Sequence, residues 1–107
     1  MATPKLIVAC PPPKDGDAFE AIYHQKHVPM AVAKLEDKTK IVAIKVLQSP
    51  QGTPRFYRIA EVYFPSMEAL QRCAASAGAQ ETLANAAKTS SGGPPVIMIA
   101  EDDTFNF

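Results

Sequence analysis

The chain has 107 residues, enough for one folded core, and we expect residues 1–107 to form a single domain. Its 11 basic residues balance its 11 acidic residues, which argues against nucleic acid or an anionic membrane surface as a partner. Hydrophobic residues make up 47% of the chain, which supports a folded core. No stretch approaches the roughly 20 apolar residues that span a bilayer.

The two cysteines, Cys10 and Cys73, are far apart in the sequence and match no metal-binding or redox spacing. The apolar part of the first residues is too short for a signal-peptide core. We therefore expect a cytoplasmic protein in which both thiols are reduced.

The first predicted strand is residues 5–10, "KLIVAC", an apolar run closed by three prolines, which cannot donate ladder hydrogen bonds. A helix follows from Ala18, where apolar residues begin to recur at helical spacing, and Asp17 is its predicted N-cap. We expect Pro29 to interrupt or kink this helix and to push Val28 toward extended geometry.

This first helix carries both histidines of the chain. Its predicted inner stripe contains Phe19, Ile22, Tyr23, Lys26 and Met30. At about 100° per residue, His27 falls beside this stripe, where its imidazole can point into the space between helix and sheet. His24 falls further toward solvent, and we expect it to be a solvated surface residue.

Two further strands are predicted at residues 39–49 and 55–64, because both are rich in β-branched or aromatic side chains and a turn-forming segment separates them. Alternation along the later strand puts Tyr57, Ile59, Glu61 and Tyr63 on one face, and Phe56, Arg58, Ala60, Val62 and Phe64 on the other. Both faces carry large apolar side chains, so we expect both to be covered.

The last third of the chain predicts more helix and a final strand. Residues 67–80 have an apolar helical stripe that Gly78 weakens or ends, residues 81–91 add a short helix, and residues 96–100 form a strand. The order β-α-β-β-α-β predicts a ferredoxin-like α+β fold, with a four-stranded antiparallel sheet and its helices on one face. The uncovered face needs a partner, and the same face of a second copy would give a sheet-on-sheet homodimer.

Several of these segments together resemble the EthD family of dimeric α+β barrel proteins. They are "KLIVACPPP", "DAFEAIYHQKHVPMA", "RFYRIAEVYFPSMEAL" and "GGPPVIMIAE", and a specific element is the aromatic-x-x-x-His-x-Pro pattern from Tyr23 to Pro29. The resemblance implies a ferredoxin-like homodimer whose two sheets pack into a barrel. It implies no single reaction. The founding member is linked to bacterial degradation of a fuel ether alongside a cytochrome P450, and wider relatives are lactone isomerases, polyketide cyclases and cofactor-free monooxygenases.

His27 is the first candidate for acid or base catalysis, and the family's His-x-Pro element also falls on it. Its alternative role is structural, satisfying a carbonyl freed at Pro29. A buried Glu61 would need a partner such as a tyrosine hydroxyl, Arg58 of a neighbouring chain, or His27, whose tautomer it would fix. The alternative for Glu61 is an ion pair at the dimer seam. Tyr23 is either core filling or a hydroxyl that orients a substrate oxygen.

The predicted substrate pocket adjoins these catalytic candidates, His27, Tyr23 and Glu61. Its further lining residues are Tyr57, Tyr63, Met30 and His24. We expect no metal there, because no Cys or Glu has a convincing spacing from the two histidines. The chain also carries no flavin, nicotinamide or nucleotide signature, so we expect chemistry without a cofactor.

Different kinds of function fit these residues. The first is a small enzyme of isomerase or cyclase type that moves a proton on a hydrophobic, cyclic or aromatic metabolite, with His27 as acid and base. The substrate class rests on the resemblance alone. The second is a non-catalytic binding protein, or an accessory protein to an oxygenase in the catabolism of a small organic compound. A cofactor-independent monooxygenase is a third hypothesis.

Overall fold

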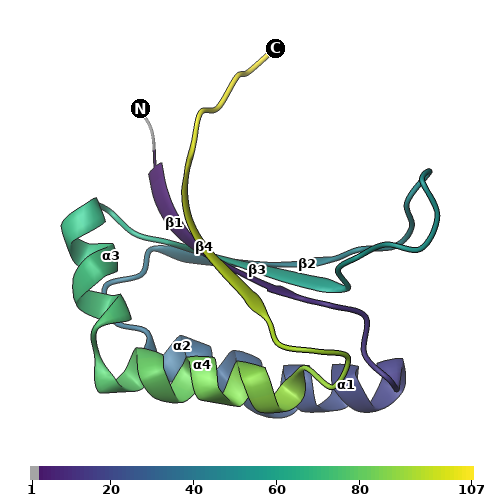
Figure 1. The fold of residues 1–107 in the computed structure, drawn as a ribbon. Coiled ribbons are helices and arrows are strands. Elements are labelled where there is room, and N and C mark those ends of the chain that lie inside the picture. The colour runs from purple at the N-terminus through teal and green to yellow at the C-terminus, as the bar shows by residue number, and fades with distance from the viewer. Residues whose placement is uncertain (1–2) are drawn as a thin grey trace.

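A computed structural model describes residues 3–107, and its centre is one antiparallel sheet of four strands (Figure 1). The strands are β1 (Thr3–Cys10), β2 (Lys40–Lys45), β3 (Arg58–Tyr63) and β4 (Val96–Asp102), in the order β2-β3-β1-β4. The predicted ferredoxin-like fold is confirmed. Strands β2 and β3 are shorter than predicted. The chain leaves the sheet after Lys45 and rejoins it only at Arg58, so the connection between the two strands is longer than the predicted turn.

All the helices lie on one face of this sheet (Figure 1). They are α1 (Gly16–Ile22), the π-helix η1 (Tyr23–His27), α2 (Val28–Lys34), α3 (Met67–Ala74) and α4 (Ala77–Thr89). α4 starts earlier than predicted because Ser76 caps it, its hydroxyl accepting the Ala79 N–H at 3.1 Å. Gly78 therefore lies inside α4 and ends no helix. A Cβ at Gly78 would collide with the Lys34 carbonyl oxygen, so this glycine lets α4 pack closely on α2.

α1 begins earlier than the sequence predicts. Asp15, not Asp17, is its N-cap, because the Asp15 backbone is extended and its carboxylate accepts the Ala18 N–H at 3.1 Å. Asp17 lies in the first helical turn instead, where its negative charge still favours the positive end of the helix dipole.

The first helix continues past Pro29 because its middle turn is a π-helix. At the end of η1 the Val28 N–H donates to the Tyr23 carbonyl, five residues earlier, and Val28 itself is helical (φ −61°, ψ −46°). The extended geometry predicted at Val28 is therefore wrong. A wider turn tolerates proline, which has no N–H and whose ring presses against the carbonyl four residues before it in a regular helix.

The π-turn also changes which side chains face the sheet. The buried ones recur at every fourth residue: Phe19, Tyr23, His27, Ala31 and Leu35. Ile22, which the helical wheel places in the inner stripe, is 43% exposed. In a regular α-helix a four-residue spacing drifts by about 40° at each step, and the wider turn offsets part of that drift. His27 therefore faces the sheet more directly than a regular wheel predicts.

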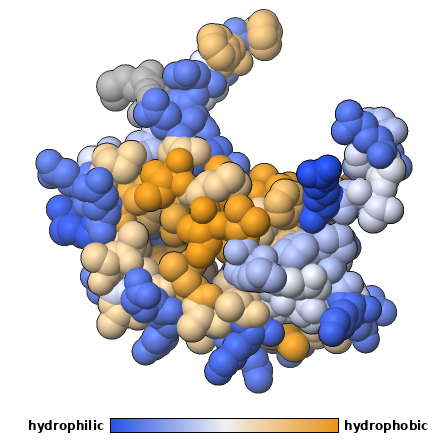
Figure 2. All heavy atoms as spheres, in the orientation of Figure 1, coloured by the Kyte–Doolittle hydropathy of each residue, from blue (hydrophilic) through white to orange (hydrophobic). Residues whose placement is uncertain are grey.

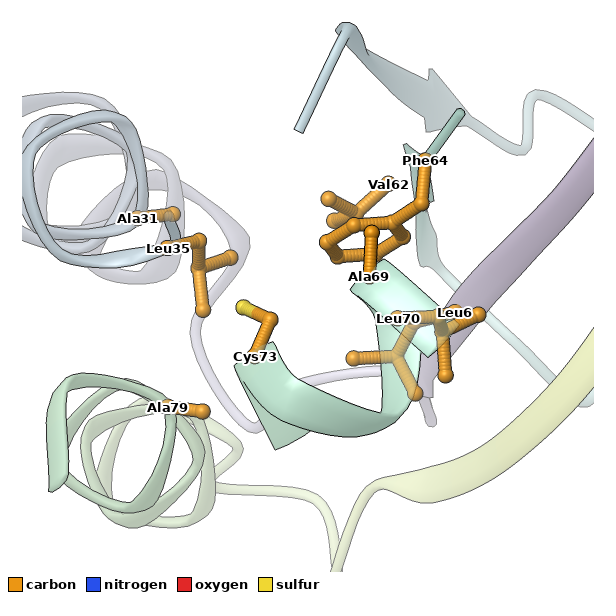
Figure 3. Packing of buried hydrophobic residues seen from close by; sticks show 9 residues of the cluster. All are labelled: Leu6, Ala31, Leu35, Val62, Phe64, Ala69, Leu70, Cys73 and Ala79. Carbon is orange, nitrogen blue, oxygen red and sulfur yellow. The ribbon is translucent and has the colours of Figure 1, made fainter. Parts of the chain in front are cut away.

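The main hydrophobic core lies between the sheet and the helices (Figure 3). Its buried members are Leu6, Ala31, Leu35, Val62, Phe64, Ala69, Leu70, Cys73 and Ala79. In Figure 3 these side chains converge from the sheet and from α2, α3 and α4. Phe64 and Leu70 are the largest fully buried side chains, and the Cys73 thiol packs as a small hydrophobic group.

The other face of the sheet, which we call the open face, carries no helix among residues 3–107 (Figure 1). It consists of Lys5, Ile7 and Ala9 of β1, Lys40, Val42 and Ile44 of β2, Ile59, Glu61 and Tyr63 of β3, and Val96, Met98, Ala100 and Asp102 of β4. The β2–β3 connection and the residues after β4 extend past the sheet on this side (Figure 1). The helices therefore cover one face of β3, and the other face has no helix over it among residues 3–107.

The edge strand β4 adds apolar surface of its own. Val96, Ile97, Met98 and Ile99 are all between 43% and 56% exposed. In Figure 2 apolar side chains gather across the front of the molecule, where β4 runs in Figure 1. Exposed apolar patches of this kind mark surfaces that bind another molecule.

Candidate functional site

A small cavity lies between the sheet and the helices and shares part of its wall with the main core. Its volume is about 30 Å³, which is room for roughly one water molecule. Apolar side chains from β1, β3, α2 and α4 form most of the wall, and the polar members are Tyr23, His27 and Thr82. The Thr82 hydroxyl donates to the Gly78 carbonyl at 2.8 Å. Tyr23 and His27 are therefore the polar lining side chains best placed to meet a ligand.

His27 is buried on the wall of this cavity, and its predicted position between helix and sheet is confirmed. Its exposed fraction is 8%, and its ring stacks on Tyr23 with the centroids 5.6 Å apart. Its Nδ1 lies 2.9 Å from the Oδ1 of Asn85 in α4. A side-chain amide, and not a carbonyl freed at Pro29, is thus the hydrogen-bond partner of this ring. Among residues 3–107, no group hydrogen-bonds Nε2.

Tyr23 belongs to a second, smaller buried cluster that it forms with Cys10 and Phe19. The Phe19 ring lies 5.5 Å from the Tyr23 ring, and the guanidinium carbon of Arg58 lies 5.0 Å from the same ring. Burial raises the pKa of the Tyr23 phenol. The hydroxyl is therefore protonated near neutral pH and can donate a hydrogen bond.

Tyr57 lies on the helix side of the sheet, so its predicted place beside Glu61 and Tyr63 is wrong. Its ring meets Phe19 edge-on, with the centroids 5.4 Å apart, and it packs against the Tyr23 cluster. The reason is that β3 begins only at Arg58. Tyr57 precedes the regular strand, so strand alternation does not extend to it.

Glu61 and Tyr63 lie on the open face, on the other side of the sheet from His27. The Glu61 carboxylate is 2.9 Å from the Lys5 ammonium and accepts the Tyr63 hydroxyl at 3.3 Å. Lys5 also pairs with Asp102 at 2.6 Å, and the hydrogen bonds that Lys5 donates to Asp102 and Glu61 raise the pKa of Lys5. We call Lys5, Glu61, Tyr63 and Asp102 the open-face charge cluster. Within one chain Glu61 therefore has a tyrosine and a lysine as partners, and not His27.

His24 lies outside the cavity, with 59% of its side chain exposed. Its Nε2 is 3.2 Å from the Arg58 guanidinium and 3.8 Å from the Glu20 carboxylate. The predicted surface position of His24 is confirmed, and the structure does not bring it to the cavity that His27 lines.

Met30 faces the outer side of the helix layer. It lines a surface groove of about 250 Å³ together with Glu81, Ala84, Asn85 and Lys88. Asn85 thus contacts His27 on one side and borders this groove on the other. The predicted site residues therefore divide among four places: the inner cavity, the outer groove, the open face, and the surroundings of Phe19 and Arg58, where Tyr57 and His24 lie.

Arg58 is the centre of a charge cluster that sequence reasoning missed. It is 7% exposed, and its guanidinium donates twice to Glu20 of α1, from Nε at 3.0 Å and from Nη2 at 2.6 Å. This hydrogen-bonded guanidinium lowers the pKa of Glu20. Alternation assigned Arg58 correctly to the face opposite Glu61, but no sequence pattern indicates which helix residue meets it.

Asn85 is the second residue that sequence reasoning missed. The sequence feature that could have indicated it is its place in α4, beside the buried residues Ala79, Thr82 and Ala86, which recur at helical spacing. A polar residue beside such a stripe lies close enough to the interior to reach a buried partner.

Two further properties concern the described residues 3–107. They contain no cluster of three His, Cys, Asp or Glu side chains that could hold a metal ion. None of their helices is both long and apolar enough to cross a bilayer.

Solved structures share this fold. An EthD family protein from Bacillus halodurans is 27% identical with a TM-score of 0.84, covering 94% of this chain and 99% of its own. An EthD-like protein from Ralstonia eutropha is 23% identical with a TM-score of 0.71, covering 94% and 91%. At lower identity, a dimeric ferredoxin-like protein from Jannaschia (14%, TM-score 0.62, covering 95% and 99%) and a hydroxynitrile lyase from Passiflora edulis (11%, TM-score 0.68, covering 98% and 97%) show the same fold.

The sequence comparisons agree with this likeness. A curated relative from Rhodococcus erythropolis, described as an uncharacterized 11.0 kDa protein in the thcB-thcC intergenic region, is 30% identical over 90 residues. That match covers 84% of this chain and 86% of the relative. The family model of the EthD domain matches residues 11–88. On this evidence the chain belongs to the EthD family.

Proposed function

We propose that this protein binds a small hydrophobic metabolite, cyclic or aromatic, and that His27 moves a proton on it without a bound cofactor. One observation carries the proposal: a buried imidazole lines an apolar cavity and has an oriented partner at one ring nitrogen. Imidazole is the side chain best suited to accept and return a proton near neutral pH. An apolar wall around it favours a hydrophobic ligand.

The proposed chemistry is an isomerisation or cyclisation with no net change in protons. Nε2 of His27 accepts a proton from an acidic C–H or O–H of the ligand, and the electron pair of that bond moves onto a ligand oxygen. Tyr23 also lines this cavity, and in the proposal its hydroxyl donates a hydrogen bond to that oxygen. The imidazolium then returns the proton to another atom of the ligand.

The ligand needs more room than the cavity offers. About 30 Å³ holds roughly one water molecule, whereas the groove on the outer side of Asn85 has about 250 Å³. We propose that a ligand enters where Met30 and Asn85 separate the two spaces, and that the Met30 side chain moves aside to join them while Asn85 keeps its contact with His27. In this proposal His24 and Tyr57 support the helix layer and do not contact the ligand.

We also infer a homodimer in which the open faces of two copies pack together. Ile7, Val42, Ile44, Ile59 and Met98 offer a continuous apolar surface there. The dimeric ferredoxin-like protein of Jannaschia supports the inference by its shared fold. Glu61 and Tyr63 then belong to the subunit interface, where the ion pair of Glu61 with Lys5 neutralises charge that would otherwise be buried alone and Tyr63 donates to Glu61.

A second candidate is a carrier or an accessory protein to an oxygenase, which binds the metabolite and leaves it unchanged. The small number of polar groups in the cavity favours it, because binding alone requires fewer positioned groups than catalysis. A cofactor-independent monooxygenase would instead consume oxygen in the presence of a quinol.

A proton-exchange assay in D₂O separates these functions. Small phenols and lactones serve as probes, and NMR follows both the His27 ring signals and the loss of the acidic C–H signal of each lactone. We expect the wild-type protein to speed this exchange and His27→Gln to slow it by at least about a hundredfold, while His24→Gln keeps the wild-type rate. Binding without exchange supports the carrier, and oxygen uptake with a quinol supports the monooxygenase. If no probe alters the His27 signals, the binding site itself is wrongly assigned.

A further inference from the structure

We propose that Asn85 is a positioning residue for His27. Its side-chain oxygen holds the proton of the neutral imidazole on Nδ1 and leaves Nε2 free to act as the base. The inference rests on the proposed function of His27, and it adds a role for a residue of α4, far from His27 in the sequence.

The geometry of the contact fixes which atom carries the proton. Oδ1 of Asn85 and Nδ1 of His27 are 2.9 Å apart, which is an ordinary hydrogen-bond distance. An amide oxygen has lone pairs but no hydrogen, so only a protonated Nδ1 can form this bond. The neutral ring has a single N–H, and Nε2 is then left with its lone pair.

The surroundings of Asn85 favour this orientation of its amide. The side chain is half-buried, and its outer side borders the groove that Glu81 also lines. Glu81 lies one helical turn before Asn85, and its carboxylate pairs with Lys34. The Asn85 amide oxygen faces Nδ1 of His27, so the NH₂ group on the other side of the amide is left to the open groove.

An amide partner also differs from a carboxylate in its electrical effect. A carboxylate beside the ring would stabilise the imidazolium and retain its proton to higher pH. The neutral oxygen of Asn85 orients the ring without adding a charge to the cavity. Asn85 therefore orients the ring and leaves the lone pair of Nε2 available to accept a proton from the ligand.

The test is the tautomer of His27, read from long-range ¹H–¹⁵N NMR spectra in which the two ring nitrogens give separate signals. The chain has two histidines, so His24→Gln assigns the remaining ring to His27. At a pH where the ring is neutral, we expect wild-type His27 to carry its proton on Nδ1. In Asn85→Ala the Nε2–H form should appear. In Asn85→Asp the NMR titration midpoint of His27 should move to higher pH by about one unit or more.

Lys88→Gln is the matched control, because Lys88 is exposed and borders the same groove without bonding His27. In Lys88→Gln the tautomer of His27 and its NMR titration midpoint should equal those in the wild-type protein. An Nε2–H ring in the wild-type protein, or an unchanged tautomer in Asn85→Ala, overturns the proposal. Should Asn85→Ala not fold, the wild-type tautomer and the near-isosteric Asn85→Asp decide. No ligand is needed, so this test can fail while the exchange assay succeeds, and the reverse.

Discussion

The two faces of the sheet combine apolar and charged side chains, yet the chain completes only one of them. On the helix face the charge of Arg58 is met by Glu20, which comes from a different layer. On the open face the charge of Lys5 is met by Glu61 and Asp102, which come from neighbouring strands of the same sheet. Because Lys5 is paired within its own layer, the open face can receive another apolar surface there without leaving that charge unpaired.

The apolar parts of the two faces differ in the same way. The core between the helices and the sheet buries its large residues almost completely, as with Leu70 of α3 at 0% exposure. The edge strand β4 is exposed on both faces, with Ile99 on the helix side at 56% and Met98 on the open face at 44%. In the proposed homodimer, stability within one chain and association between chains would draw on opposite sides of one sheet, so substitutions should separate them.

Opening the core between helices and sheet at Leu70 of α3 should give the largest effect. Leu70→Ala is expected to lower the free energy of unfolding by about 4 kcal/mol, because the fully enclosed side chain would leave a cavity. Urea denaturation measures this. Leu47→Ala, at a position that is 83% exposed, should change the same quantity by less than about 0.5 kcal/mol. Equal effects at the two positions would contradict the core described above.

Breaking the open face at Ile59 should act on association. Ile59→Asp puts a carboxylate between Ala9 and Ile44, and we expect it to raise the dimer dissociation constant at least about a hundredfold, close to 2.7 kcal/mol. Sedimentation equilibrium measures the constant. Val32→Asp, on the exposed side of α2, is the control and should remain dimeric. If Val32→Asp were monomeric while Ile59→Asp remained dimeric, the subunits would instead associate through the helix layer.

The ion pair of the helix face should make stability depend on acid. Because the Arg58 hydrogen bond lowers the pKa of Glu20 in the folded state below its ordinary value of 4.5, its stabilisation is complete above about pH 5. It is lost as the pH falls through the lower, folded-state pKa. Glu20→Gln should therefore cost about 2 kcal/mol at pH 6 and progressively less toward pH 3, measured by thermal or urea unfolding. Glu36→Gln, at an exposed position, should follow the wild-type pH profile.

The smallest expected effect concerns the start of the helix layer. Asp15→Ala should cost about 1 kcal/mol, since it removes the acceptor for the Ala18 N–H. Asp17→Ala should cost only a few tenths of a kcal/mol, the value of a charge near a helix N-terminus. Thermal unfolding of both variants under the same conditions makes the comparison. A larger loss for Asp17→Ala would restore it as the cap.

Much of the fold was predictable because its signals are local. Hydrophobic runs ended by prolines or glycines located the strands, and the order of elements limited the topology to the ferredoxin-like one. The errors came from effects that a sequence window does not contain. A proline inside a helix usually ends or kinks it, but the π-turn before Pro29 lets the helix continue. Gly78 stays helical because the Lys34 carbonyl approaches it so closely that only a residue without a side chain fits.

The candidate site was less predictable, because it depends on contacts between distant segments. The wheel predicted the burial of His27, yet Asn85 lies 58 residues away and only the packing of α4 brings it near. Strand alternation placed Glu61 on the face opposite Arg58 but could not say which of these faces the helices cover. Tyr57 shows the limit of alternation, since the pattern holds only where the strand is regular.

The π-turn also matters for tracing ancestry among related chains. A π-turn corresponds to one residue inserted into an α-helix. When a chain with the π-turn is aligned with a chain that lacks it, the correct alignment therefore has a one-residue gap inside a helix, where alignments rarely allow gaps. A descendant that lost that residue would turn its aligned histidine by about 100°, away from the cavity. A histidine that a sequence alignment places opposite His27, within the segment from Phe19 to Leu35, is thus poor evidence of an equivalent catalytic base. The position of the ring in superposed structures is the better criterion.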